Sequence, residues 1–375
     1  MNFKFCTLML PILVGLPFAS VAASTSSENE DVPTTTMKSH TTENTLDDDV
    51  TYDGPLTIKL GTRVDYQRVY QKSDLLDEQS GFKGNNLMIS IQGNITNKFS
   101  YRFRQRISQT KTNNNFFDGT DYMWLQYNFN NRWDIRAGKV AIEYGSTEYQ
   151  RDPSEQYVFS DYWNYPACYL FGVNVGYNLT DNDRFVFQAA ESSFRSKENS
   201  DLYAYALSWY GNHNWFHTMY SLNLTEYRNG NYICYVSLGN QFDLGQVTVN
   251  VDYQNRFTDS GNVFKDMTLR GEVMFRPSDY LNVIGFAVYS SNKTHDLGVG
   301  YLPYGSELTR FGGILEFSPI PKIDKYLKIH AGYSYGTGHE GIKDAVPEQN
   351  RHLITTGVQW EMDIVSLAKK IWKKN

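Results

Sequence analysis

Apolar and polar residues alternate along most of the chain with a period of two. In residues 99–108, FSYRFRQRIS, the side chains of Phe99, Tyr101, Phe103 and Ile107 fall on one face, and three arginines fall on the other. This alternation predicts a β-strand with one apolar face and one strongly basic face. Such a strand fits a soluble sheet that binds an anion, or a membrane barrel with lipid outside and water inside.

Sixteen segments between residues 56 and 364 show this alternation, and short turns such as NITN and RPSD alternate with generally longer loops. An even number of strands with short turns at one end and long loops at the other is typical of outer-membrane barrels. A soluble sandwich or propeller would share the period but bury the apolar face. The sequence therefore predicts an all-β fold, a 16-stranded antiparallel transmembrane β-barrel over residues 55–365, with short periplasmic turns and long extracellular loops. In one segment, residues 280–289 (YLNVIGFAVY), both faces are apolar, so the pattern leaves its orientation open.

Composition and the N-terminal segment support the membrane reading. Aromatic residues make up 15% of the chain although only 41% of residues are hydrophobic, as alternating strands with interfacial aromatic girdles would require. Residues 1–23 combine Lys4, an apolar stretch and a small-residue end, which predicts a secretory signal peptide. Residues 24–50 are rich in Ser, Thr, Asp and Glu and predict a flexible acidic linker. We therefore expect a protein of the outer membrane of a Gram-negative bacterium.

If the apolar faces contact lipid, the opposite faces line the interior of the barrel. Arginines on one strand face would repel one another in a dry core, whereas a water-filled pore tolerates them. This assignment predicts a set of pore-lining basic residues, namely Lys59, Arg63, Arg102, Arg104, Arg106 and Arg136.

The longest irregular stretch, residues 138–168, follows the fifth strand. Loops of this length are usually functional or disordered, and this one is rich in aromatic and charged residues. Its position after the fifth strand resembles that of the third extracellular loop of porins, which folds back into the lumen. The resemblance implies a constriction loop, with candidate residues Lys139, Glu143, Glu148, Arg151 and Asp152. Acids of this loop (Glu143, Glu148 and Asp152) would then face the arginines and set a transverse field that favours polar solutes. The alternative is that all these residues are merely solvated and do not select among solutes.

The segment AGKVAIEYGSTEYQRDP resembles the Gly-Lys…Gly-x-x-Glu segment of the phosphate-selective porin O/P family, particularly its Bacteroidetes-type members. Gly138, Lys139, Gly145, Glu148 and Arg151 stand where that pattern expects them. The resemblance covers about residues 55–364 and implies a homotrimeric, 16-stranded diffusion porin with an inward-folded third loop. No residue pattern points to phosphate in particular.

The C-terminal residues depart from the usual end of such barrels. These barrels commonly end on an aromatic residue that the barrel assembly machinery reads, whereas this chain continues past Trp360 and Met362 into a basic tail, residues 366–375. The tail contains Leu367, Ile371 and Trp372, so it forms either a short amphipathic helix on the inner leaflet or a frayed end.

No enzymatic chemistry is expected. GYSYG, residues 332–336, matches a nucleophile-elbow pattern, but it lies within an alternating strand rather than a strand-to-helix turn. We expect no catalytic residues, metal, cofactor or nucleic-acid partner. The expected function is passive diffusion of small hydrophilic solutes and ions across the outer-membrane lipid bilayer, with weak preference for anions. The alternatives are a substrate-specific channel or surface-binding barrel acting through loops 290–308 and 336–350, and a barrel plugged by its own loop.

Overall fold

A computed structural model describes residues 54–107, 116–164, 167–196, 199–257, 263–294, 302–322, 326–341, 346–347 and 350–372. The predicted signal peptide and acidic linker, and parts of the loops at 290–308 and 336–350, lie outside the described residues. Residues 51–375 belong to one compact unit.

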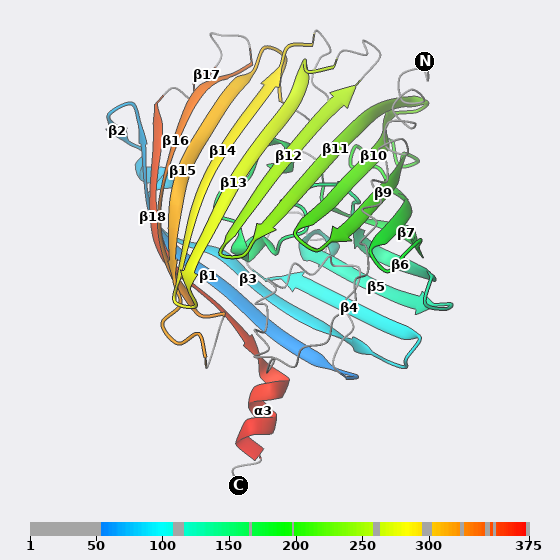
Figure 1. Cartoon of the computed structure of the whole chain (residues 1–375). Helices are drawn as coiled ribbons and strands as arrows, with labels where there is room; N and C mark the ends of the chain where they lie inside the picture. The colour runs from blue at the N-terminus through cyan, green and yellow to red at the C-terminus, as the bar shows by residue number, and fades with distance from the viewer. Residues whose placement is uncertain are drawn as a thin grey trace, which may run out of the picture. The chain divides into compact units, whose positions relative to one another are not determined.

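The described residues form sixteen long strands and two strands of two residues (Figure 1). The long strands are β1 (Thr57–Gln71), β3 (Gly81–Asn94), β4 (Phe99–Arg106), β5 (Thr120–Asn128), β6 (Trp133–Ala141), β7 (Tyr169–Asn178), β8 (Asp183–Glu191), β9 (Tyr203–His213), β10 (Phe216–Arg228), β11 (Asn231–Leu244), β12 (Val247–Phe257), β13 (Asp266–Ser278), β14 (Leu281–Asn292), β15 (Glu307–Phe317), β16 (Lys328–Glu340) and β18 (Arg351–Asp363). The two short ones are β2 (Asp74–Leu75) and β17 (Val346–Pro347). The helices are η1 (Asp77–Gln79), η2 (Phe116–Gly119), η3 (Pro153–Glu155), α2 (Asp161–Asn164) and α3 (Ile364–Trp372). Within the described residues, no helix is both long and apolar enough to cross a bilayer.

The long strands form a closed antiparallel barrel. Each pairs with the long strands before and after it in the chain, and β1 also pairs with β18, from Lys59↔Asp363 to Gln71↔Arg351. This last pairing closes the ring and leaves no long strand as a free edge. Each of the sixteen predicted segments coincides with one long strand, so the predicted fold is confirmed.

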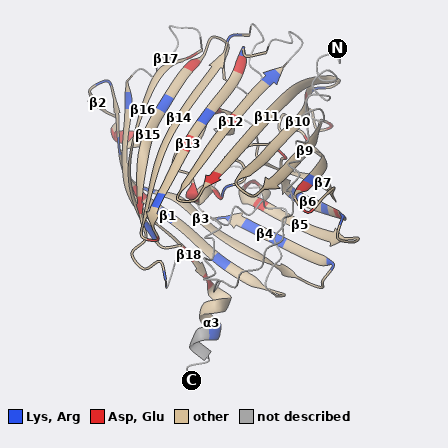
Figure 2. Cartoon of the chain, viewed as in Figure 1, with Lys and Arg blue, Asp and Glu red and all other residues tan. Residues whose placement is uncertain are grey.

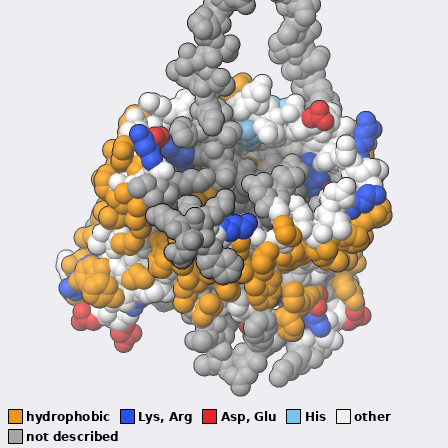
Figure 3. All heavy atoms as spheres, turned by 90° about the horizontal axis from the view of Figure 1, so that it is seen from below, with side chains coloured by type: hydrophobic (Ala, Val, Ile, Leu, Met, Phe, Trp, Pro, Cys, Tyr) orange, Lys and Arg blue, Asp and Glu red, His pale blue; other side chains and the backbone are white. Residues whose placement is uncertain are grey.

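The two faces of the barrel have opposite chemistry. Outward side chains such as Val64, Phe187 and Val358 are exposed, between 45% and 49%. Arg63 and Asp65, on either side of Val64 in the same strand, are 6% and 1% exposed because they point into the barrel. Seen end-on, hydrophobic side chains gather along much of the outer edge (Figure 3), while charged residues recur along the strands (Figure 2). A soluble sheet protein would bury its apolar face. Here the apolar side chains point outward and the charged side chains point inward, which is the arrangement of a barrel that faces lipid.

The connections follow the predicted two classes with two exceptions. The turn between β3 and β4 (95–98) and the turn between β7 and β8 (179–182) lie at the same end of the barrel as the start of α3 (Figure 1). Most connections at the other end are longer, but β10 and β11 are joined there by only residues 229–230. Conversely, the connection between β15 and β16, at the end with the short turns, spans residues 318–327. We take the end with the short turns as the periplasmic end.

The C-terminal tail is helical from Ile364 to Trp372. The Asp363 carboxylate accepts hydrogen bonds from the backbone N–H of Ser366 (3.0 Å) and from its hydroxyl (2.7 Å). Asp363 therefore caps the first turn, in the way that stabilises helix N-termini. Of the two predicted alternatives, the structure has the helix, and it begins two residues before the predicted boundary at residue 366.

Candidate functional site

The connection between β6 and β7 runs through the interior of the barrel. Arg63 on β1 donates to the carbonyl oxygens of Ser154 (3.4 Å) and Gln156 (2.6 Å) in this connection. Asp252 on β12, in another part of the ring, accepts from the backbone N–H of Thr147 at 2.8 Å. The connection, residues 142–168, is called the inner loop below. It contacts inner faces on widely separated strands, so it crosses the lumen.

The first part of the inner loop is held by an apolar cluster. Ile142, Tyr144 and Tyr162 pack with Ile233 and Tyr235 of β11, and none of these side chains is more than 5% exposed. The aromatic rings meet edge to face, with centroids 5.6 to 5.8 Å apart. Such pairs add to the stabilisation that burial alone provides.

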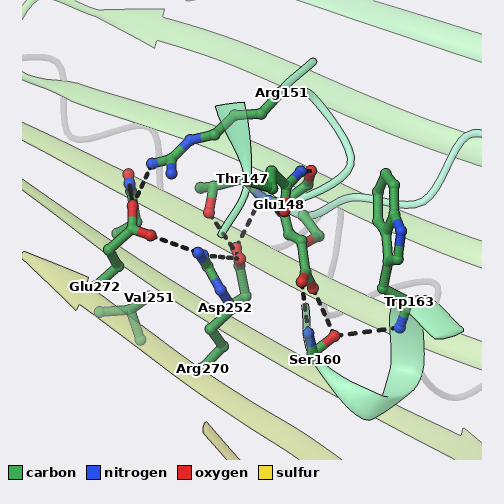
Figure 4. A network of polar contacts seen from close by, with 12 residues as sticks. Thr147, Glu148, Arg151, Ser160, Trp163, Val251, Asp252, Arg270 and Glu272 are labelled. Carbon is green, nitrogen blue, oxygen red and sulfur yellow. Dashed lines mark hydrogen bonds and ion pairs between the residues drawn. The ribbon is translucent and has the colours of Figure 1, made fainter. Parts of the chain in front are cut away.

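The middle of the inner loop is held by charged and polar groups (Figure 4). The carboxylate of Asp252 accepts from the hydroxyl of Thr147 at 2.7 Å as well as from its backbone N–H. Arg151 forms an ion pair with Glu272 of β13, and Arg270 contacts Glu272 at 2.6 Å and Asp252 at 3.6 Å. Each buried charge therefore has an opposite charge beside it, without which its burial would be costly.

Glu148 lies inside this network but is bonded to its own loop. Its carboxylate accepts hydrogen bonds from the backbone N–H of Ser160 at 2.6 Å and from the Ser160 hydroxyl at 2.5 Å. Glu148 is only 1% exposed, and this burial raises the pKa of its carboxyl above the usual value. The residue closes the loop on itself rather than facing the arginines of β4.

The far part of the inner loop rests on an apolar patch inside the barrel. Tyr157 and Val158 pack against Met274, Ile284, Phe286 and Ile314, which come from β13, β14 and β15. The Tyr157 hydroxyl donates to Glu316 at 2.6 Å, and its ring lies 4.3 Å from the guanidinium of Arg63. This patch explains why residues 280–289 are apolar on both faces, since one face meets lipid and the other meets the loop.

The strands β4 to β6 form an arginine-rich part of the inner face, called the arginine wall below. Arg104 contacts Asp121 at 2.9 Å, Asp152 of the inner loop at 3.1 Å and the hydroxyl of Tyr169 at 2.6 Å. Arg106 shares Asp121 at 2.8 Å. The inner loop therefore touches the arginine wall at one carboxylate, that of Asp152.

Aromatic rings separate the arginines of this wall. The guanidinium of Arg102 lies 4.2 Å from the ring centroid of Tyr122, and that of Arg136 lies 4.5 Å from Trp124. Arg136 also donates to Gln126 at 2.8 Å. Cation–π contacts and shared carboxylates hold these like charges side by side.

The comparisons with known proteins identify the family. Residues 56–273, more than half of the chain, match the family described as phosphate-selective porin O and P. The chain belongs to this porin family. It is an outer-membrane porin, a channel for passive diffusion of small hydrophilic solutes. No curated protein sequence matches the chain.

Solved porin structures share the fold of this porin. An anion-selective porin from Comamonas acidovorans is 9% identical, with a TM-score of 0.58 over 82% of this chain and 99% of that one. The outer-membrane channel DcaP of Acinetobacter baumannii is 10% identical, with a TM-score of 0.59 over 84% of this chain and 99% of that one. OmpT of Vibrio cholerae is 10% identical, with a TM-score of 0.54 over 82% and 97% of the two chains. At 9% to 10% sequence identity, the similarity to these structures shows a shared fold.

The predicted basic residues of this porin all lie on the inner face. Several of them are buried or form ion pairs and hydrogen bonds with neighbouring side chains. Arg104 and Arg136 are 3% and 6% exposed, and Lys59 forms an ion pair with Glu361 at 3.0 Å. Arg63 is bonded to Asp65 at 2.7 Å in addition to the loop carbonyls. Arg63, Arg104 and Arg136 are therefore covered by acids, amides and the inner loop.

The predicted set of loop acids is also corrected in part. Asp152 forms an ion pair with Arg104 of the arginine wall at 3.1 Å. Glu143 instead accepts from Asn174 at 2.8 Å and from the hydroxyl of Tyr210, while Glu148 is bonded to Ser160. The two glutamates face away from the arginines because the aromatic cluster and the Ser160 contacts fix the loop backbone. Of the three predicted loop acids, one therefore forms the charged contact between the inner loop and the arginine wall.

Lys139 does not lie in the inner loop. Strand β6 continues to Ala141, so the loop begins at Ile142 rather than at Gly138. In the strand register Lys139 is opposite Met123 and Phe171, which share the outward face, and its amine donates to the carbonyl oxygen of Phe117. The structure therefore places Lys139 in β6, because the strand extends four residues beyond Ala137.

The structure explains why the two positions Gly138 and Gly145 of the family pattern are occupied by glycine. Gly138 has a φ of +132°, and a Cβ there would lie 2.1 Å from the carbonyl oxygen of Met123 on β5. Gly145 is pressed against β10, where a Cβ would lie 2.5 Å from the backbone of Met219. A larger residue at Gly145 would push the inner loop away from β10.

The sequence did not identify Asp121 as a partner of the arginines. Its neighbours Tyr122 and Trp124 alternate regularly, and a strict period of two places Asp121 on the outer face. The pairing of β4 with β5 shifts at this point, where Gln105 is opposite Thr120 and Arg104 is opposite Tyr122. The resulting bulge leaves Asp121 unpaired in the ladder and turns its carboxylate toward Arg104 and Arg106.

Proposed function

We propose that this porin conducts small hydrophilic solutes and ions with a weak preference for anions, along the arginine wall. The observation that carries the proposal is an excess of positive charge on β4 to β6. Among the residues that the structure describes, the carboxylates of Asp121 and Asp152 contact this wall, which carries four arginines, Arg102, Arg104, Arg106 and Arg136. Asp134, on the same wall, is paired with Arg184 at 2.8 Å.

The residues of this wall would have different roles. Arg104 is almost fully enclosed and holds the inner loop through Asp152. Arg102 and Arg106 are only partly buried, and the side chain of Arg106 is 20% exposed. A charge at the border between protein and water attracts counter-ions without trapping them. Arg102 and Arg106 are therefore the proposed source of the anion preference.

Solute flux into liposomes tests passive diffusion. Proteoliposomes are mixed with uncharged and anionic solutes of increasing size, and swelling rates are recorded over a range of concentrations. Passive diffusion predicts rates that rise linearly with concentration and fall with solute size. Saturation at low concentration would instead support a substrate-specific channel, and no swelling from correctly folded protein would support a barrel plugged by its inner loop.

We also propose that the porin is a homotrimer that the barrel assembly machinery inserts. The proposal rests on the family resemblance, and an interface between protomers would use part of the apolar outer face. Light scattering of the detergent-purified protein, corrected for bound detergent, measures the protein mass directly. A mass of one protomer in mild detergent would contradict the trimer.

A further inference from the structure

Helix α3 follows the last strand directly and extends beyond the end of the barrel (Figure 1). On β18 the outward side chains include Ile354, Val358 and Trp360, which are 50%, 45% and 37% exposed. Met362 and then Ile364 continue this row of even-numbered positions, and Ile364 is 37% exposed although it is already the first residue of α3. The apolar side of the helix thus begins on the same side of the barrel wall as the lipid-facing residues.

The helix carries an apolar stripe and basic residues. Leu367, 44% exposed, follows Ile364 at a spacing of three, and Ile371 follows it at a spacing of four, which places the three positions on one helical face. Lys369 is exposed, and the sequence adds Lys370, Lys373 and Lys374 at this end of the chain. A short helix with an apolar stripe and a lysine cluster is the type that binds the surface of an anionic bilayer.

The position of α3 in the fold indicates which leaflet of the outer membrane lies near it. It starts directly after the last strand, at the end of the barrel with the short turns (Figure 1). That end is the periplasmic end, where the inner leaflet of the outer membrane meets water. The cap at Asp363 and Ser366 makes the helix begin at this boundary.

We propose that α3 binds the inner leaflet of the outer membrane, with Ile364 and Leu367 among the acyl chains and Lys369 against anionic phospholipid headgroups. Each lysine near an anionic surface contributes on the order of 1 kcal/mol. The helix would thereby anchor the seam where β18 closes against β1. The proposal depends on the membrane location of the porin and does not depend on its ion preference.

Hydrogen exchange of the full-length porin in nanodiscs tests the proposal. We expect the backbone amides of 367–372 to exchange at least about tenfold more slowly in discs containing phosphatidylglycerol than in discs of phosphatidylcholine alone. The double variant Lys369→Glu/Lys370→Glu should lose this difference, and the matched variant Lys369→Arg/Lys370→Arg should keep it. The amides of β18 should be the same in all samples, because the barrel itself is unchanged.

Two results would overturn the proposal. Equal exchange in anionic and neutral discs would mean that the charge of the lipid headgroups does not hold the helix, so anionic phospholipid would not be its partner. Slow exchange that persists in the Lys369→Glu/Lys370→Glu variant would mean that the barrel, not the leaflet, protects it. Conductance measured on the same samples reports pore function separately, so failure of the anchor is distinguishable from failure of the pore.

Discussion

Individual carboxylates decide how the like charges of the arginine wall coexist. Asp121 lies between Arg104 and Arg106 and contacts both below 3 Å. It reaches them only because the strand pairing shifts beside it. A bulge depends on the pairing of two strands, so the period of one strand cannot reveal it.

Replacing Asp121 by Asn should leave the two arginines without their shared carboxylate. We expect the variant to be about 3 kcal/mol less stable, because breaking one partner of a buried ion pair leaves an uncompensated charge. Unfolding in urea from detergent micelles measures this change. Asp118→Asn, which removes an exposed carboxylate three residues away, is the control and should have little effect. Equal stability of the Asp121 and Asp118 variants would contradict the role of Asp121.

The buried Glu148 predicts a pH dependence of the inner loop. Its pKa is raised when the loop is folded in, so the folded loop binds the proton more tightly than the released loop does. This contribution is fully present below the pKa of the released loop and is lost as the pH rises through the raised pKa. We therefore expect trypsin to cut after Arg151 more readily as the pH rises through that window, after correction for the enzyme's own pH profile. Glu148→Gln should remove this part of the dependence, and an unchanged profile in that variant would contradict the assignment.

At the scale of elements, strands were predictable and loop contacts were not. Most long strands repeat one local rule, apolar outward and polar inward, which a single sequence displays directly. Strand β14, which is apolar on both faces, is an exception that the loop packed inside the barrel explains. The inner loop was predicted to enter the lumen from its length and position, but its orientation depends on distant partners. The pairing of Tyr157 with Glu316 joins residues far apart in the chain, and nothing near Tyr157 in sequence indicates it.

The far anchor of the inner loop should depend on the ring of Tyr157 more than on its hydroxyl. Tyr157→Phe loses one hydrogen bond to Glu316, worth about 1.5–3 kcal/mol because the acceptor is charged. Tyr157→Ala also loses the packing on the apolar patch and the contact with Arg63. We expect single-channel current noise to increase in the order wild type, Phe variant, Ala variant. Equal noise in wild type and the Ala variant would show that this anchor does not restrain the loop.

At the scale of the whole molecule, one barrel holds two kinds of inner surface. Apolar patches on β11 and on β13 to β15 receive the inner loop, and the arginine wall meets it mainly through Asp152. The loop is thus fixed against other walls, while positive charge is concentrated on β4 to β6. This asymmetry is the physical basis of the proposed anion preference.

Ionic strength should modulate that preference. The Debye length falls from about 10 Å at 0.1 M salt to about 3 Å at 1 M, so charges at the edge of a water-filled path are screened in concentrated salt. We expect the ratio of anion to cation permeability to move toward that of free solution as salt is raised at a constant concentration ratio. A ratio that does not change would point to steric selection rather than to the field of the arginine wall.

The most direct test of the central claim is the reversal potential of single channels under a KCl gradient. Wild-type porin should reverse on the anion-selective side, and Arg102→Ala/Arg106→Ala should shift the potential toward zero or beyond it. Lys98→Ala, which removes an exposed positive charge from the turn between β3 and β4, should reverse as wild type does. A cation-selective wild type, or an arginine variant indistinguishable from it, would contradict the claim that the arginine wall sets the selectivity of the pore.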